Sequence, residues 1–299
     1  MEGNVSEISF QTAFAKLLID GEARAAVAAG SAPGSFEISE ADAARLRAID
    51  QGRMGLYADL LVMNRLAKAV EALPCTTKAL GEHLWPLTLA WNHASPPVQA
   101  RKYDEAMAFG NYLLETIGSR SYEPTYLKDV LLYEMTRLEL RYTTVHEPPA
   151  AQAERCPALL EELARGEGYT RVYPERAPHT RVLALDHDVQ PIMEELVQGR
   201  VPTEVEPRLT YALMAVDRGG RVQPFAVNLP TAAFISAATG EASFAEVLTW
   251  LAQVFQEETP EQIQALGAGL AGLCAALVEQ GVILLSDHPA SRGVEPALN

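Results

Sequence analysis

Hydrophobic positions in the first half of the chain recur every three or four residues, the spacing of helices with one buried face. The longest such segment is 54–72, where we expect an apolar stripe to be buried while Arg65, Lys68 and Glu71 lie elsewhere. The stripe consists of Leu56, Leu60, Met63, Ala67 and Val70. Further helices are expected from Ser6, from Ser39 to Ile49, from Thr76 or Thr77 to Trp91, and over 102–117 and 124–141. The pattern predicts an all-helical region of about six helices from residue 6 to about 145.

The second half contains a different pattern, beginning with two apolar runs joined by Gly219-Gly220. The runs at 210–218 and 222–229 predict a β-hairpin. Three helices are expected to follow, and a short strand over Val282–Leu285 closes the pattern. The helices are marked by Pro230 to Gly240, by a capping box at Ser243–Glu246, and by a cap at Thr259–Gln262 with an end at Gly281. This order is typical of a small winged-helix-like domain.

A two-residue turn would make Arg218 and Arg221 the closing pair of the hairpin. Pairing would then alternate outward and place Pro224 opposite residue 215, at a position that forms no hydrogen bond within the hairpin. Proline is tolerated at such a position on an edge strand, so we expect 222–229 to be a free edge. The buried face would contain Met214, Val216, Phe225, Val227 and Leu229. The alternative is that a loop or the strand expected at 181–186 covers this edge.

The fold class expected from these patterns is α+β and mainly α, with an N-terminal helical bundle followed by the winged-helix-like domain. Residues 1–146 form the helical domain, and residues 147–180 are expected to be a linker and irregular connection because 147–154 is rich in proline and alanine. Within this connection, 157–165 has a weak helical pattern. Residues 181–299 form the second domain, which includes a strand at 181–186 and a helix at 191–196.

Composition limits the classes of partner. The chain has 299 residues and a formal net charge of −15, which repels a phosphate backbone and argues against nucleic acid as a partner. Its three cysteines are too few and too scattered for a disulfide framework. No apolar run approaches the ~18 residues that span a bilayer, and the first residues lack the basic start of a signal peptide. We therefore expect a cytoplasmic protein that does not bind membranes.

Motifs that could carry chemistry are weak. Gly267, Gly269 and Gly272 match the dinucleotide fingerprint GxGxxG, but the residues before them are expected to be helical and the fingerprint needs a strand there. These glycines are instead expected to permit close packing. The Asp186–Asp188 stretch alternates faces on a strand, so its three side chains would not converge on a metal unless the strand bends there. Glu115, Glu134 and Glu139 are expected in surface ion pairs. We predict no catalytic residues, metal or cofactor.

The free edge is the most specific functional feature. An exposed strand beside a helix with an apolar stripe can bind an extended peptide by strand addition. The missing N–H of Pro224 predicts the best pairing at Ala226 and Asn228, and the helix expected at 259–280 would supply the groove. The candidate peptide-binding residues are Val222, Gln223, Phe225, Ala226, Val227, Asn228, Leu266, Leu270 and Leu273.

A family resemblance rests on residues spread through the N-terminal half. They are Leu56-Tyr57, Arg65, Val70–Pro74, Thr77, Leu80–Glu82, Pro96-Pro97 and Tyr126–Glu134. In these the chain resembles the helical "putative DNA-binding domain" family, whose members accompany multinuclear non-haem iron oxidases in the biosynthesis of ribosomally made, post-translationally modified peptides (RiPPs). The C-terminal domain is similar to the RiPP recognition element, as found in the peptide chaperone of pyrroloquinoline quinone synthesis.

The resemblance implies a non-catalytic partner protein. The C-terminal domain would bind the leader of a precursor peptide beside Val222–Leu229, and the helical domain would dock on an iron oxidase as a heterodimer. The alternative is a transcriptional regulator that binds DNA through its winged helix. That alternative needs a basic face, yet the segment 259–280 contains no lysine or arginine.

Overall fold

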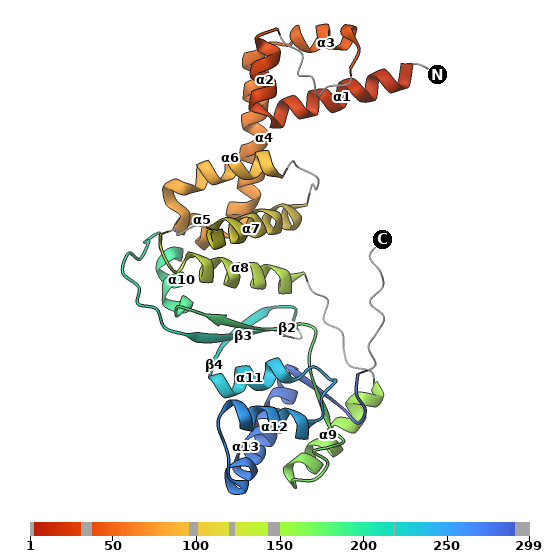
Figure 1. Ribbon diagram of the computed structural model, residues 1–299, viewed down its shortest axis with the longest axis vertical. Coiled ribbons are helices and arrows are strands. Elements are labelled where there is room, and N and C mark those ends of the chain that lie inside the picture. Colours follow the sequence, from red (N-terminus) through yellow and green to blue (C-terminus); the bar gives the residue numbers. More distant parts are fainter. Residues whose placement is uncertain are drawn as a thin grey trace. The chain divides into compact units, whose positions relative to one another are not determined.

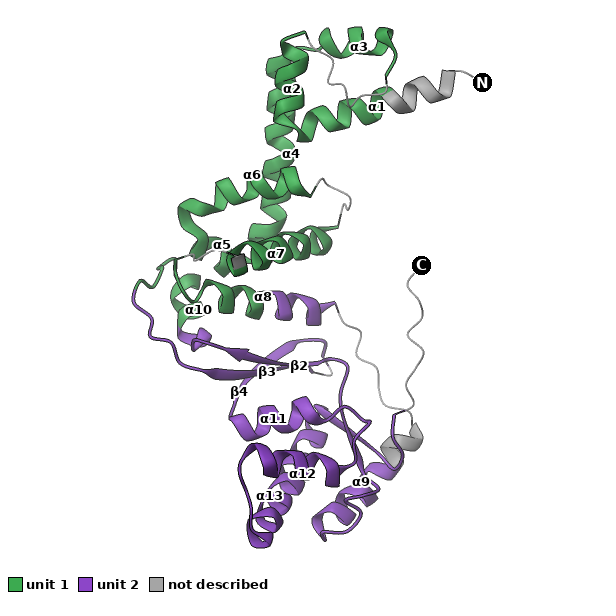
Figure 2. Ribbon diagram, viewed as in Figure 1, with its two compact units in different colours: residues 1–134, 192–203 green, residues 135–191, 204–299 purple. Residues whose placement is uncertain are grey.

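The structure is a computed structural model that describes residues 3–30, 38–95, 101–119, 123–142, 150–217 and 219–290, with the backbone alone for residues 3–9, 119 and 150–154. Helices dominate the described residues (Figure 1). The chain divides into two compact units, residues 1–134 with 192–203 and residues 135–191 with 204–299 (Figure 2). The α+β, mainly α class is therefore confirmed. The unit boundaries differ from the expected 1–146 and 181–299, because helices α8 and α10 each contribute residues to both units.

Unit 1 contains the helices expected in the first half of the chain. They are α1 (Gly3–Ile19), α2 (Gly21–Ala28), α3 (Glu40–Arg47), α4 (Gln51–Ala72), α5 (Pro74–Leu80), a 3-10 turn (Gly81–His83), α6 (Leu84–Ala94), α7 (Lys102–Ser119) and the start of α8 (Leu127–Arg141). Ser39 caps α3 as expected, because its hydroxyl accepts from the N–H of Asp42. The helix expected from Thr76 or Thr77 to Trp91 is interrupted at Gly81, whose φ of 51° ends α5.

The buried face of α4 is not the one that the sequence predicted. The buried residues of α4 are Met54, Ala58, Val62, Arg65 and Ala69. Leu56, Leu60 and Met63, which were expected to be buried, are exposed by 60%, 53% and 53%. At about 100° per residue the two sets are centred roughly 160° apart, so α4 has two apolar faces. The prediction selected the wrong face because Arg65 seemed to exclude the other.

Arg65 is buried because the interior of unit 1 satisfies its guanidinium. Its Nε donates to Glu105 at 2.9 Å, and its Nη1 donates to the Asn92 side chain and to the Ser95 carbonyl, each at 2.8 Å. The guanidinium carbon also lies 3.8 Å from the ring centre of Trp91. This network joins α4, α6 and α7 through charge-assisted hydrogen bonds.

Glu134 is likewise buried and does not form the expected surface pair. Its two carboxylate oxygens accept from the N–H groups of Cys75 at 2.9 Å and Thr76 at 2.7 Å. These groups lie at the start of α5, where backbone N–H groups lack partners within the helix. Burial raises the pKa of the Glu134 carboxyl, while the two N–H donors act in the opposite direction. Glu134 on α8 therefore fixes the N-terminus of α5.

Unit 2 contains a helix and a strand within the region that was predicted to be a linker. Residues 143–149 lie outside the described residues, but 150–164 form helix α9 (Ala150–Ala164), and β1 (Tyr173–Arg176) follows. The prediction of an irregular connection over 147–180 was wrong at 150–156 and at β1, whereas the weak helical pattern at 157–165 is confirmed by α9. The reason is that Leu159 and Leu163 belong to the core of unit 2, which stabilises a helix of weak intrinsic pattern.

The remaining elements of unit 2 follow the expected order. They are β2 (Thr180–Leu185), α10 (Val189–Val197), β3 (Thr210–Val216), β4 (Val222–Val227), α11 (Leu229–Ala237), α12 (Phe244–Val254), α13 (Pro260–Glu279) and β5 (Ile283–Ser286). Capping boxes begin α12 at Ser243 and α13 at Thr259, as predicted. The expected last strand exists as β5, although it pairs with β1, a strand that the sequence did not predict.

Two antiparallel sheets are present among the described residues. One has the order β2-β3-β4, and the other consists of β1 and β5. Helix α11 lies against β3 and β2 (Figure 1). The core of unit 2 is formed by residues from α9, β3, β5 and the three helices that follow β4, with Phe234, Phe244 and Leu251 fully buried. Strand β4 is thus the outer strand of a sheet that packs against α11.

Helix α13 is apolar and long enough to cross a membrane by length and composition, alone among the described helices. Its buried face belongs to the core of unit 2 through Leu270, Cys274 and Leu277. A Cβ at Gly267 would lie 3.1 Å from Leu248 and 3.2 Å from Tyr169, so this glycine permits close packing as expected. Gly269 and Gly272 have open space, and the GxGxxG match lies within one helix.

Candidate functional site

The loop between β3 and β4 is organised by Asp217. Its Oδ1 accepts from the N–H groups of Gly219 at 2.8 Å and Arg221 at 2.9 Å, and its Oδ2 accepts from the Gln223 side chain. These hydrogen bonds, led by the one from Arg221, lower the pKa of the Asp217 carboxyl. The backbone N–H of Asp217 also donates to the Arg221 carbonyl at 2.9 Å. Asp217 and Arg221 are therefore the closing pair of the hairpin.

This turn shifts the hairpin by one residue from the predicted register. Val216 pairs with Val222 and Met214 with Pro224, whereas a two-residue turn would have paired residue 216 with Gln223. A slip of one residue exchanges the two faces of a strand. Phe225 therefore shares a face with Leu213, not with Met214 and Val216 as predicted. The Asp217 carboxylate explains the shift. It accepts hydrogen bonds from backbone N–H groups of the loop and so stabilises a loop that is one residue longer than a Gly-Gly turn.

The expected consequence of Pro224 nevertheless holds in the observed register. Hydrogen-bonded and non-hydrogen-bonded pairs alternate from the closing pair, so Val222, Pro224 and Ala226 all occupy non-hydrogen-bonded positions. Their backbone groups point away from β3. Strand β2 pairs with the other side of β3, so it does not cover this edge. In the described residues, no backbone hydrogen bond outside the hairpin involves these three positions.

The outer edge of β4 therefore offers a short row of backbone partners. Val222 and Ala226 each present an N–H and a carbonyl, and Pro224 between them presents a carbonyl alone. Asn228 was also expected to pair, but it is the N-cap of α11. Its side-chain oxygen accepts from the N–H of Thr231, and its carbonyl accepts from the N–H of Ala232. Among the predicted pairing positions, Ala226 thus keeps both of its backbone groups.

The side chains around this edge are partly apolar. Phe225 is 43% exposed and Leu229 is 45% exposed, so neither belongs to the buried face that the sequence predicted. Gln223 and Ala226 are also exposed, and Val222 and Val227 are half-buried. An apolar contact at Phe225 and Leu229 thus lies beside the unpaired backbone groups of β4.

The groove expected from α13 is only partly possible. Leu270 is 3% exposed and lies in the core of unit 2, so it cannot contact a peptide. Leu266 and Leu273 are half-buried at the margin of the same core. Leu270, which lies between these two leucines on α13, packs against the rest of unit 2 and is therefore not available to a peptide.

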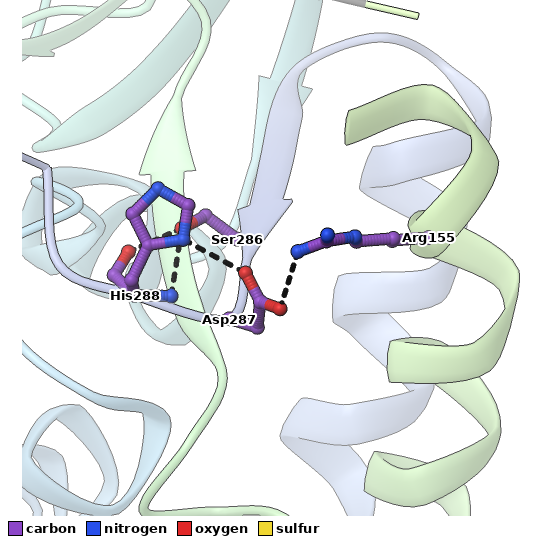
Figure 3. Close-up of polar contacts among 4 residues, drawn as sticks. All are labelled: Arg155, Ser286, Asp287 and His288. Atoms are coloured by element: carbon purple, nitrogen blue, oxygen red, sulfur yellow. Dashed lines mark hydrogen bonds and ion pairs between the residues drawn. The ribbon is translucent and has the colours of Figure 1, made fainter. Parts of the chain in front are cut away.

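A cluster of serine, histidine and aspartate at the end of β5 has the residue types of a hydrolytic triad (Figure 3). His288 Nδ1 lies 2.8 Å from Asp287 Oδ1, and Asp287 Oδ2 accepts from Arg155 at 2.7 Å. The Ser286 hydroxyl, however, contacts the backbone of His288 and not its imidazole. A triad needs the hydroxyl bonded to the imidazole nitrogen that takes its proton. This cluster is a surface turn with an ion pair.

Two further features do not form a site for chemistry. An open recess of about 360 Å³ near Tyr173 is lined by Ser243 and Glu246, but both side chains bond each other and the backbone in the capping box of α12. Across the described residues, no three His, Cys, Asp or Glu side chains form a group that could hold a metal ion. Unlike these two features, the outer edge of β4 has unpaired backbone groups beside exposed apolar side chains.

No protein-family model matches this chain, and no curated protein matches it at a significant level.

Proposed function

We propose that this protein binds the leader of a ribosomally made precursor peptide along β4 and presents it to a multinuclear iron-dependent oxidase in the cytoplasm. The observation that carries the proposal is the unpaired edge of β4, with outward backbone groups at Val222 and Ala226. An extended peptide would add as a fourth strand and gain main-chain hydrogen bonds there. The protein itself would supply binding and no catalysis.

The order of elements in unit 2 supports the recognition of a peptide. Three antiparallel strands are followed by three helices, α11 to α13, and this order supports a winged-helix-like recognition element as part of the proposal. The resemblance of the N-terminal half to oxidase partner proteins supplies the second part of the proposal, namely a heterodimer with the enzyme. The enzyme would contain the iron ions.

The spacing of groups along β4 specifies the kind of peptide. Val222 and Ala226 are four residues apart on β4, a distance of about 13 Å, and Pro224 lies midway between them. The peptide therefore needs a donor opposite the Pro224 carbonyl but no acceptor for a proline N–H. A large apolar residue near Phe225 and Leu229 would complete the contact.

Replacing Ala226 by proline tests the role of the backbone directly. Pro224 shows that the hairpin accommodates proline at a position of the same parity, so A226P removes an outward N–H without removing a hairpin hydrogen bond. A lost hydrogen bond of about 1 kcal/mol, together with the steric effect of the ring, predicts at least a fivefold weaker affinity for the precursor peptide. The matched control A226G keeps the N–H and should bind like the parent protein.

The measurement is a calorimetric or fluorescence titration of the full chain with candidate precursor peptides. F225A should also weaken binding, while W250A changes an exposed aromatic residue of α12 and should not. If no precursor peptide binds, or if A226P and F225A bind as tightly as the parent, the proposal is wrong. Sequence-specific DNA binding in a low-salt gel shift would instead favour the transcriptional regulator, for which α13 lacks any lysine or arginine.

A further inference from the structure

The exposed apolar face of α4 is separate from the peptide-binding edge of β4. We define the outer face of α4 as Leu56, Leu60, Met63, Ala67 and Val70, together with the neighbouring Tyr57. All six are exposed within the described residues, Tyr57 by 62%. They extend over about 21 Å of helix at 1.5 Å per residue. Monomeric proteins rarely expose a contiguous apolar surface of this kind.

The spacing of the outer face indicates what shape of partner it fits. Its residues follow one another at intervals of four, three, four and three, which is the heptad pattern of a coiled-coil seam. The inner face of α4 is covered by other helices of unit 1. Packing of the inner face already holds α4 as a helix, so pairing along the outer face would not require the helix to form. The outer face therefore fits another helix.

The charges beside the seam favour a second copy of α4 in antiparallel orientation. At about 100° per residue, Arg53 and Glu71 lie on the same flank of the helix at opposite ends of the seam. Antiparallel pairing brings Arg53 of each copy beside Glu71 of the other, whereas parallel pairing leaves these two residues at opposite ends of the seam. Glu71 contacts Lys102 within the chain but remains 72% exposed, so it can reach a second partner.

The same arrangement aligns the apolar layers. Leu60 of one copy lies opposite Met63 of the other, and Leu56 lies opposite Ala67, so each of these layers combines the two kinds of seam position. At each end, Val70 lies opposite Arg53, which places the arginine beside Glu71. Small Ala67 beside large Leu56 allows the helices to approach closely. The exposed parts of the six side chains equal about three whole apolar side chains per copy. Burial of these side chains on both copies would give an interface area at the low end of the range for specific protein–protein interfaces. An interface of that size predicts reversible association.

We propose that two copies of this protein associate through the outer face of α4 as a short antiparallel coiled coil. The inference does not depend on peptide binding at β4, because the two surfaces belong to different units. In a chain with a net charge of −15, pairing needs a surface with balanced charge, and Arg53 and Glu71 provide that balance. Association should therefore persist at moderate salt, because the seam itself is apolar.

The primary test is sedimentation equilibrium of the purified full chain over a wide range of concentration. We expect a monomer–dimer equilibrium, and L60E should shift it to monomer by at least tenfold in the dissociation constant. The matched control is L89E, which places the same charge on α6 at a leucine that is 44% exposed and outside the outer face. Circular dichroism of both variants verifies that the fold is intact.

A charge exchange tests the orientation. R53E and E71R should each weaken the dimer about threefold to tenfold, and the double variant R53E/E71R should restore it. A monomer at every concentration of the parent protein would overturn the proposal, as would equal loss of dimer in L60E and L89E. A dimer that the double exchange does not restore would overturn the antiparallel arrangement.

Discussion

The buried network around Arg65 gives the sharpest prediction about stability. The side chains of Arg65 and Glu105 are exposed by only 6% and 3%, and Arg65 also donates to Asn92 and to the Ser95 carbonyl. Replacing Arg65 by methionine preserves the length of the side chain and much of its contact with Trp91. It leaves the Glu105 carboxylate buried without its partner, and breaking a buried ion pair in this way costs about 3–5 kcal/mol.

The second variant separates the lost attraction from the stranded charge. In R65M/E105L no carboxylate remains to be solvated, so about half of the lost stability should return. The remaining cost reflects the acceptors of Asn92 and Ser95, which lose a donor at about 1 kcal/mol each. The double variant should therefore be more stable than the single one, although it departs further from the native sequence.

Urea unfolding of the full chain, followed by circular dichroism, measures both effects. With an m-value of about 2 kcal/mol per molar urea, a loss of about 4 kcal/mol moves the midpoint of the unit 1 transition down by about 2 M. The two units can unfold separately, so the transitions are fitted individually. A cost below about 1 kcal/mol for R65M, or a double variant no more stable than R65M, would refute the reasoning.

Three further predictions concern other buried positions. Glu134→Gln should lower the free energy of unfolding, measured in urea, by about 1–3 kcal/mol, because the amide keeps only one acceptor oxygen for the two N–H groups at the start of α5. A loss near zero would contradict the capping role. Burial lowers the pKa of His179, so its contribution to stability is fully present above about pH 6.5 and is lost as the pH falls through the lowered value. His179→Gln should flatten the stability curve in that window, and an unchanged slope would show that another group titrates. Gly267→Ala should destabilise unit 2, because the new Cβ would meet Leu248 and Tyr169. Gly269→Ala and Gly272→Ala have open space and should each stabilise unit 2 by up to about 1 kcal/mol. The reverse order of stabilities in thermal unfolding would contradict the packing.

Long-range partners decided where the sequence predictions were wrong. The residues of α4 contain two apolar faces, and the spacing of one is as regular as that of the other. The side chains that neutralise Arg65 come from positions 92, 95 and 105, far along the chain, so no local pattern shows that an arginine can be buried. Glu134 was assigned to the surface for the same reason, since its partners are 58 and 59 residues away.

The candidate site combines both kinds of information. The hairpin, the free edge and the effect of Pro224 followed from the apolar runs and the parity of pairing. The register did not follow, although Asp217 was a local signal, because aspartate often accepts from N–H groups that follow it in a turn. The burial of Leu270 depended on packing with the rest of unit 2 and had no local signal.

The sequence by itself determined the features that depend on neighbouring residues. The capping boxes at Ser243 and Thr259 and the cap at Ser39 are formed by groups within a few residues of one another. Only the tertiary structure decided which face of α4 is buried and which side chains remain beside the edge of β4. Both depend on contacts between distant segments, and the burial of a charged or apolar group is favourable only where such a segment supplies its partner.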